Sequence, residues 1–274
     1  MLGSIVGDII GSRFEGMNNY PRIKNFSLFP KSTRFTDDTI MTVATCDAIL
    51  FGRNYGDVYK EYYARYPHAG YGKSFKAWAQ SENKDPYNSW GNGSAMRVSP
   101  IGWAFKTETE VLEEAKNSAS VTHNHPEGIK GAQSVALAIH MLRNGANKRD
   151  VDERISKDFE YDLHPAIKNE WDVSCQGCVP QAFASFLDSV GFEDCIRRAI
   201  FRGGDSDTIA AIAGSIAEPY YGIPKDIMES TFYKLSEDIS NITELFIQKY
   251  IDECFEKPRI EDYNWKRLFR ILIR

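Results

Sequence analysis

The spacing of apolar residues restricts the fold of this chain more than any other feature. In residues 38–51, apolar side chains recur every three to four positions after an acidic start, as in a helix that packs by one face. Residues 126–144 begin with Pro126 and stop at Gly145, which are the residue types preferred at the start and just past the end of a helix. The alternation of Val, Ile and Thr typical of strands is almost absent. The chain is therefore predicted to be all-α.

Similar signals predict helices along the rest of the sequence. Proline is expected to end one of them at Pro219. No Gly-rich or Pro-rich linker divides the chain, so residues 1–274 are predicted to form one compact domain, with a helical C-terminal extension at 223–274. The further predicted helices are 56–66, 73–82, 108–119, 150–157, 180–190, 192–201, 208–218 and 225–256.

Composition and charge exclude several classes of protein. The net charge is −5 and the pI about 5.6, so the chain has no overall attraction for nucleic acids or anionic membranes. The apolar N-terminal stretch is interrupted by Asp8 and follows no basic segment, so it is not predicted to be a signal peptide. No run approaches the roughly 18 apolar residues of a membrane-spanning helix.

Cysteine usage indicates a reducing compartment. The five cysteines are an odd and sparse set, which predicts free thiols and a cytoplasmic protein. Cys175 and Cys178 form a single C-x-x-C pair without a second pair or a suitably spaced histidine. Two buried helical thiols are therefore favoured over a zinc or redox site.

Two short motifs place carboxylates and hydroxyls at predicted helix starts: TDDT at 36–39 and GGDSDT at 203–208. One aspartate is enough to cap a helix, so two at each start exceed that need. Four carboxylates with neighbouring hydroxyls suit two hard divalent cations. The residues alone leave capping and metal binding as equal alternatives. The candidate ligands are Thr36, Asp37, Asp38, Asp205, Asp207 and Thr208.

Three further polar clusters have both a functional and a structural interpretation. GNGSAMR at 91–97 lets the backbone approach a ligand closely, and amides at a helix start can bind phosphate, but a structural loop has the same pattern. The histidines of VTHNHPEG, at 121–128, can bind a ligand or cap a turn. In GDIIGSRFEG, at 7–16, Glu15 is either a base near a site or a surface residue at a helix end.

Aromatic residues are frequent before the GNGS stretch. Tyr71, Trp78, Tyr87 and Trp90 are candidates to line a binding site, with core packing as the alternative for each.

Taken in order, these motifs resemble the ADP-ribosylglycohydrolase family, which includes dinitrogenase reductase-activating glycohydrolase and the ADP-ribosyl-acceptor hydrolases. The order is GD-x-x-G-x-x-x-E, TDDT, GNG-x-AMR, TH-x-x-P and GGD-x-DT, and the resemblance covers residues 3–222. It implies a compact, orthogonally packed all-α bundle with two Mg²⁺ or Mn²⁺ ions between the two aspartate motifs.

The resemblance also implies roles for individual residues. Thr36, Asp37 and Asp38 match one metal-ligand set, and Asp205, Asp207 and Thr208 match the other. Glu15 matches a mobile acidic residue near the metals, and with Asp38 and Asp205 it forms the expected catalytic set. The residues expected to bind substrate are His123 and the diphosphate loop of Asn92, Gly93, Ser94 and Met96.

The activity implied is metal-dependent hydrolysis of the bond between the distal ribose of ADP-ribose and an acceptor. The expected partner is an ADP-ribosylated protein or a small ADP-ribosyl compound, with arginine as the leading acceptor. O-linked ADP-ribose, on serine or as O-acetyl-ADP-ribose, is an alternative linkage. A relative that binds ADP-ribose without catalysis is a second alternative, because a fold does not guarantee turnover.

Overall fold

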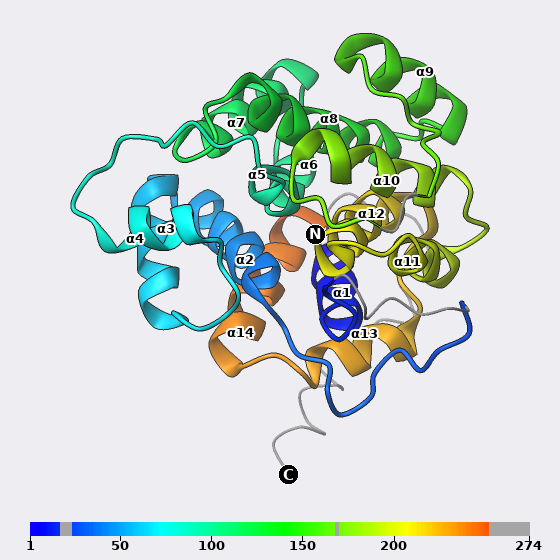
Figure 1. Cartoon of the computed structure of the whole chain (residues 1–274), viewed down its shortest axis with the longest axis horizontal. Coiled ribbons are helices and arrows are strands. Elements are labelled where there is room, and N and C mark those ends of the chain that lie inside the picture. Colours follow the sequence, from blue (N-terminus) through cyan, green and yellow to red (C-terminus); the bar gives the residue numbers. More distant parts are fainter. Residues whose placement is uncertain (17–23, 168–169, 252–274) are drawn as a thin grey trace.

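The computed structural model describes residues 1–16, 24–167 and 170–251. Within these ranges the regular structure is helical, and the sole β-type pairing is an isolated bridge between Gly91 and Ser174. The all-α prediction is confirmed (Figure 1). The helices are α1 Leu2–Gly11, α2 Asp37–Phe51, α3 Tyr55–Arg65, α4 Lys73–Gln80, α5 Gly93–Met96, α6 Ser99–Ala104, α7 Glu108–Ser120, α8 Pro126–Arg143, α9 Lys148–Phe159, α10 Cys175–Leu187, α11 Phe192–Phe201, α12 Ser206–Tyr221, α13 Lys225–Phe232 and α14 Glu237–Phe246, which is followed by a π-helical turn at Ile247–Ile251.

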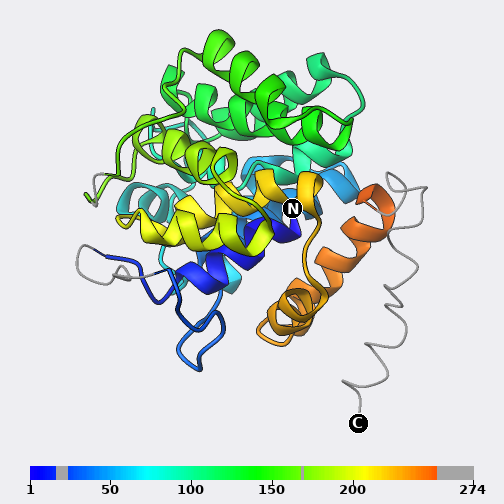
Figure 2. The ribbon, with the colours of Figure 1, turned by 90° about the vertical axis from the view of Figure 1, so that its right-hand side faces the viewer.

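The central contact of the fold is between α1 and α12, which lie side by side in the middle of the molecule (Figures 1 and 2). Every residue of α1 is buried, although it is only ten residues long. Around this pair, α8, α10 and α11 pack against α12, while α2 packs against α1 and carries α3 and α14 on its other sides. The two central helices are therefore surrounded by α2, α8, α10 and α11.

Glycines spaced four residues apart let α1 approach α12 to backbone contact. A Cβ atom at Gly3 would lie 2.2 Å from the carbonyl oxygen of Gly214, and one at Gly7 would lie 2.1 Å from that of Ala210. At Gly11 the nearest atom would be the Cα of Asp207, at 2.5 Å. Positions four apart lie on one helix face, so the three glycines form one flat contact surface. This surface brings the start of α12 against the end of α1.

Most predicted helices are found close to their predicted bounds, and the differences have local causes. Helix α10 begins at Cys175 rather than 180 because Ser174 caps it by accepting a hydrogen bond from the N–H of Gly177. Helix α12 continues past Pro219 to Tyr221, so the prediction that this proline ends the helix is wrong. A proline in the last turn removes one hydrogen bond, and the burial of α12 retains the helix.

The predicted helix at 225–256 is interrupted in the described part. Its first part is α13, and a second helix, α14, begins after Ser236. Residues 252–256 of that prediction, and residues 252–274 of the predicted C-terminal extension, lie outside the described residues. Helix α6 was not predicted, since its six residues are too few for a clear periodicity.

Two further observations concern membrane-spanning helices and the cysteines. Within residues 1–16, 24–167 and 170–251, no helix combines the length and the apolar character that crossing a bilayer requires. Cys46, Cys175, Cys178 and Cys195 are buried free thiols, and Cys254 lies beyond the described part.

The close contact between α1 and α12 predicts that one added methyl group in α1 will destabilise the protein strongly. In Gly7→Ala, the added Cβ overlaps a backbone oxygen of α12, so the helices must separate. We expect the free energy of unfolding to fall by at least about 3 kcal/mol in a urea titration. Gly191→Ala is the control, because nothing lies within 4 Å of a Cβ there, and it should change stability by less than about 1 kcal/mol. Equal losses in the two variants would contradict the interpretation.

Candidate functional site

The two aspartate motifs meet at the starts of α2 and α12. The hydroxyl of Thr208 donates a hydrogen bond to Oδ2 of Asp38, 3.2 Å away, across 170 residues of sequence. Thr36 occupies the N-cap of α2, and its side chain accepts from the N–H of Asp38 at 3.3 Å. Asp205 occupies the N-cap of α12, but its side chain makes no capping hydrogen bond. Capping therefore accounts for Thr36 and does not account for the four aspartates.

Two groups of carboxylates in this region are close enough to share ions. One group is Asp8, Asp38 and Asp207, and the other is Glu15, Asp205 and Asp207. Within each group, one carboxylate oxygen per residue lies within 4.8 Å of the others. Asp207 belongs to both groups, so it joins them into one acidic cluster.

Asp37 lies beside this cluster, at the first position of α2. Its N–H donates to the carbonyl of Ala69 at 3.0 Å, and its side chain packs against Gly70. A Cβ at Gly70 would lie 2.8 Å from Oδ1 of Asp37, and φ there is +119°, so glycine is needed at this position on both counts. The segment at 68–72, HAGYG, therefore packs directly against Asp37.

The structure adds Asp8, which sequence reasoning had not assigned to the site. Its carboxylate accepts hydrogen bonds from the N–H and hydroxyl groups of both Thr36 and Thr39. Asp8 is fully buried on α1, and these bonds fix the start of α2 relative to α1. An isolated acidic residue in an otherwise apolar helix was the available signal, since a buried carboxylate needs partners.

Burial and mutual repulsion dominate the electrostatics of the cluster. For Asp37 and Asp38, after burial, the charge of Asp8 is the next largest cause of a raised pKa. Burial raises the pKa of Asp205 to about 6, and the hydrogen bond from Asn92 offsets part of this effect. Burial is the largest cause of a raised pKa at Asp37 and at the four aspartates of the cluster, which are Asp8, Asp38, Asp205 and Asp207.

The donor set of the cluster fits a hard cation. Oδ1 of Asp38 is fully buried and, among the residues placed by the structure, has no hydrogen-bond partner. Buried carboxylate oxygens without donors are costly unless a positive charge faces them. Carboxylates and threonine hydroxyls are the ligand types of Mg²⁺ and Mn²⁺.

The cluster lies at one end of a cleft of about 350 Å³. Of the predicted site residues, the cleft is lined by Glu15, Asp37, Asp38, Asn92, Gly93, Met96, His123, Asp205, Asp207 and Thr208. Two predicted site residues do not line it. The Thr36 hydroxyl donates to Asp8, and the Ser94 hydroxyl donates to the carbonyl of Gly128 at 2.7 Å. Both side chains therefore stabilise the walls.

The backbone of the GNGS loop is only partly available to a ligand. The N–H of Asn92 donates to a carbonyl of the segment before α10, at 2.8 Å. The N–H groups of Ala95 and Met96 donate to the carbonyl of Asn92, each at 2.9 Å. In the placed part of the chain, the amides of Gly93 and Ser94 make no hydrogen bond, so these two are the candidates for anion binding.

His123 is held as a neutral ring against the loop. Burial, and then the charge of Arg97, place its pKa well below the usual value. Its Nδ1 lies 2.7 Å from the hydroxyl of Thr122, and a Cβ at Gly93 would lie 3.1 Å from its Nε2. Arg97 also lines the cleft, but its guanidinium is held by other partners: it stacks on Tyr59 and donates to Thr122.

The aromatic candidates divide between the cleft and the core. Tyr71 and Tyr87 line the cleft, while Trp78 is buried in the core and Trp90 is largely exposed, outside the cleft lining. Trp171 also lines the cleft, and it was not among the candidates. Its segment precedes α10 and carries no periodicity or motif from which its position follows.

Comparisons with known proteins agree with the sequence resemblance. A family model described as ADP-ribosylglycohydrolase matches residues 1–256. ADP-ribosylhydrolase ARH3 of Danio rerio is 26% identical over 302 residues, covering 81% of this chain and 82% of that protein. ADP-ribosyl-[dinitrogen reductase] glycohydrolase of Rhodospirillum rubrum is 24% identical over 265 residues, covering 81% and 84%. A solved structure titled ADP-ribosylglycohydrolase-related protein complex shares the fold, with a TM-score of 0.72, 23% identity and coverage of 90% and 95%.

The raised pKa of Asp205 predicts a pH effect on stability in the presence of a chelator. From pH 3.8 to about 6, the folded protein keeps a proton on Asp205 that the unfolded chain releases, so its contribution to stability falls as pH rises. The stability of the wild type relative to Asp205→Asn should therefore fall by roughly 2–3 kcal/mol between pH 4 and pH 7.

Measuring the difference from the variant removes the opposite trend of His123 and His140, whose pKa values are lowered. Urea titrations in EDTA at each pH give this difference. Asp226→Asn, at an exposed position of α13, is the control and should show no such trend. A difference that stays constant with pH would contradict the predicted pKa of Asp205.

Proposed function

The chain belongs to the ADP-ribosylglycohydrolase family, and we propose that it hydrolyses the glycosidic bond between the distal ribose of ADP-ribose and an acceptor, with two bound divalent cations. The observation that carries the proposal is the convergence of the TDDT and GGDSDT motifs on one acidic cluster at the end of a cleft. The GNGS loop lines the same cleft, so one molecule can contact both.

Asp37, Asp38, Asp205, Asp207 and Thr208 would hold the two cations. When bound, Mg²⁺ or Mn²⁺ would neutralise the carboxylates, orient the hydroxyls of the distal ribose and lower the pKa of a coordinated water. Thr36 would not bind a cation itself but would orient Asp38, because its hydroxyl donates hydrogen bonds to Asp8 and Asp38. The buried and unpartnered Oδ1 of Asp38 supports the metal assignment.

We propose Glu15 as the residue that moves a proton. Its carboxylate lies within 4.8 Å of those of Asp205 and Asp207, and its side chain is exposed, so it can reach the open part of the cleft. In this position it can orient or deprotonate the attacking water, or assist departure of the acceptor. Bond cleavage at the anomeric carbon is expected to pass through an oxocarbenium-like state, as in other glycosidic cleavage.

The diphosphate would lie against the GNGS loop. The amides of Gly93 and Ser94 would bind its oxygens, and the neutral ring of His123 packs against Gly93. Because this end of the cleft is fixed by backbone contacts, it would hold the distal ribose in one orientation at the acidic cluster.

Arginine on a protein remains the acceptor that we propose first, and O-linked ADP-ribose remains the alternative. The names of the relatives do not separate these linkages, because ADP-ribosylhydrolase ARH3 and ADP-ribosyl-[dinitrogen reductase] glycohydrolase match with 26% and 24% identity. The acceptor is therefore decided by assaying both linkages side by side.

The first test is release of ADP-ribose from arginine-linked, serine-linked and O-acetyl substrates, each with Mg²⁺, Mn²⁺ or EDTA. We expect release from at least one substrate, abolished by EDTA and restored by the metal. Asp207→Ala should lower kcat/KM by at least about 100-fold, because it removes the ligand shared by both carboxylate groups. Asp226→Ala, at an exposed position outside the cleft, should leave activity unchanged.

Calorimetric titration of Mn²⁺ into the same variants separates this proposal from capping. The variants compared are Asp37→Ala and Asp207→Ala. If the aspartates only cap helices, each variant should be less stable than the wild type by about 1 kcal/mol and should bind Mn²⁺ with unchanged affinity. Activity that persists in EDTA overturns the metal-dependent mechanism. Tight ADP-ribose binding without release from any substrate identifies a non-catalytic relative.

The second test concerns Glu15. If it moves the proton, Glu15→Gln should lower kcat by about 10²–10⁴-fold and leave the affinity for Mn²⁺ within about threefold of wild type. Glu15→Asp should recover part of the rate. A loss of Mn²⁺ affinity in Glu15→Gln that matches the loss of rate would assign Glu15 to metal binding instead.

A further inference from the structure

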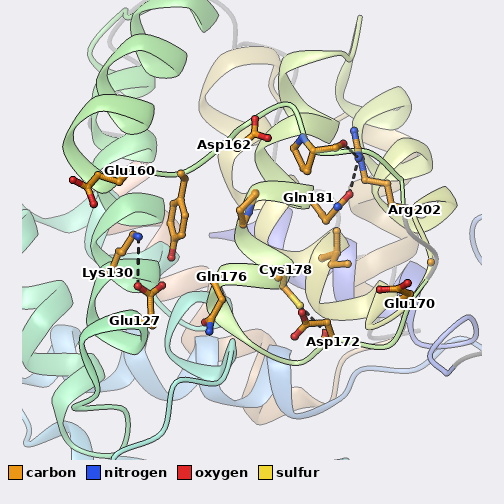
Figure 3. Close-up of a pocket in the computed structure, with 16 residues that line it drawn as sticks. Glu127, Lys130, Glu160, Asp162, Glu170, Asp172, Gln176, Cys178, Gln181 and Arg202 are labelled. Atoms are coloured by element: carbon orange, nitrogen blue, oxygen red, sulfur yellow. Dashed lines mark hydrogen bonds and ion pairs between the residues drawn. The ribbon is translucent and has the colours of Figure 1, made fainter.

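The C-x-x-C pair of α10 has no role in the proposed function, and its contacts point to one. Cys175 and Cys178 are buried at the start of the helix. The thiol of Cys175 donates to the carbonyl of Gly91 at 3.1 Å, and that of Cys178 donates to the carbonyl of Asp172 at 3.0 Å. Figure 3 shows Cys178 beside Asp172, joined by a dashed line. The pair therefore acts as two separate hydrogen-bond donors.

The two carbonyls belong to the two segments that form one wall of the cleft. These segments are joined by hydrogen bonds from the N–H of Asn92 to the carbonyl of Val173, at 2.8 Å, and from the N–H of Cys175 to that of Trp90, at 2.9 Å. The thiols thus bind both segments to the start of α10. Sulfur atoms that donate in this way are neutral, in agreement with burial, which raises the pKa of Cys178.

Cys178 makes a second contact, and this one leads to the acidic cluster. The side-chain nitrogen of Asn92 donates one hydrogen to Sγ of Cys178, at 3.2 Å, and the other to Oδ2 of Asp205, at 2.6 Å. Both hydrogens of the amide are used, so its orientation is determined by the sulfur on one side and the carboxylate on the other.

A cavity lies behind the wall, and Cys178 is part of its lining. Cys178 lines a separate cavity of about 470 Å³, together with Gln176, Gln181 and Arg202 (Figure 3). The cleft and this cavity lie on either side of the segment at 170–173, because Trp171 and Val173 line the cleft while Glu170 and Asp172 line the cavity. Cys178 lines this cavity and contacts Asn92, which lines the cleft, so the sulfur connects the two sides of the wall.

We propose that Cys178 is a positioning residue for Asp205, acting through the side-chain amide of Asn92. The inference rests on the proposed function, in which Asp205 is a metal ligand. Without the sulfur, one amide hydrogen of a buried asparagine loses its acceptor, and the amide can rotate away from the carboxylate. Residues that orient a ligand from behind affect metal affinity strongly.

The test is a double-mutant cycle with Mn²⁺ affinity as the readout, measured by calorimetry. Cys178→Ala should weaken Mn²⁺ binding about tenfold, and Asn92→Ala about 10–100-fold. In the Asn92→Ala background, Cys178→Ala should cause no further loss, because the sulfur acts through the amide. Cys178→Ser, which keeps a donor and an acceptor, should stay within about threefold of wild type. Cys195→Ala is the control for a lost buried thiol and should bind Mn²⁺ as the wild type does.

Additive losses in the double variant, or an equal loss in Cys195→Ala, would overturn the proposal in favour of a general packing effect. A second readout does not depend on metal: the side-chain amide protons of Asn92 in NMR spectra of the EDTA-treated protein. They should exchange slowly in the wild type and in Cys178→Ser, and at least about tenfold faster in Cys178→Ala. If the wild type binds no Mn²⁺, the proposed function fails, while equal exchange rates in all three proteins overturn the positioning role itself.

Discussion

The backbone contact between α1 and α12 is the constraint on which the rest of the structure depends. Three glycines on one face of α1 let the two helices touch without side chains between them. As a result, Asp8 on α1 and Asp207 on α12 reach the same small region, where Asp38 of α2 joins them. A wider separation of the helices would move Asp207 away from Asp8.

This arrangement gathers charges that repel each other in a buried place. Hydrogen bonds offset part of the cost: Thr36 and Thr39 donate to Asp8, and Asn92 donates to Asp205. Negative charge is still in excess after these hydrogen bonds. The pKa of Asp38 is raised, and among the described residues its Oδ1 has no hydrogen-bond partner. This imbalance of charge in a cleft supports the proposed binding of cations, since burial makes electrostatic interactions strong.

Much of the fold and part of the site followed from local patterns. Helix α11 was predicted closely because one apolar face repeats over several turns. Helix α2 was also predicted closely, although its residues 38–48 are all buried and it has no exposed face over that stretch. Short α6 was missed, and Pro219 was given too much weight, because the burial of α12 overrides a local preference. Local patterns do not assign Asp8 to the site, since its role depends on threonines that are about thirty residues away in sequence.

The sequence by itself determined the helical class, the two aspartate motifs and the glycine loop, because each is written in residues that are neighbours along the chain. Only the tertiary structure decided that Thr208 contacts Asp38, that Ser94 and Arg97 face the interior, and that Cys178 reaches Asp205 through Asn92. The physical reason is that these contacts join residues brought together by helix packing. Packing depends on the shapes of whole helix faces, such as the glycine face of α1, and no local pattern specifies which faces meet.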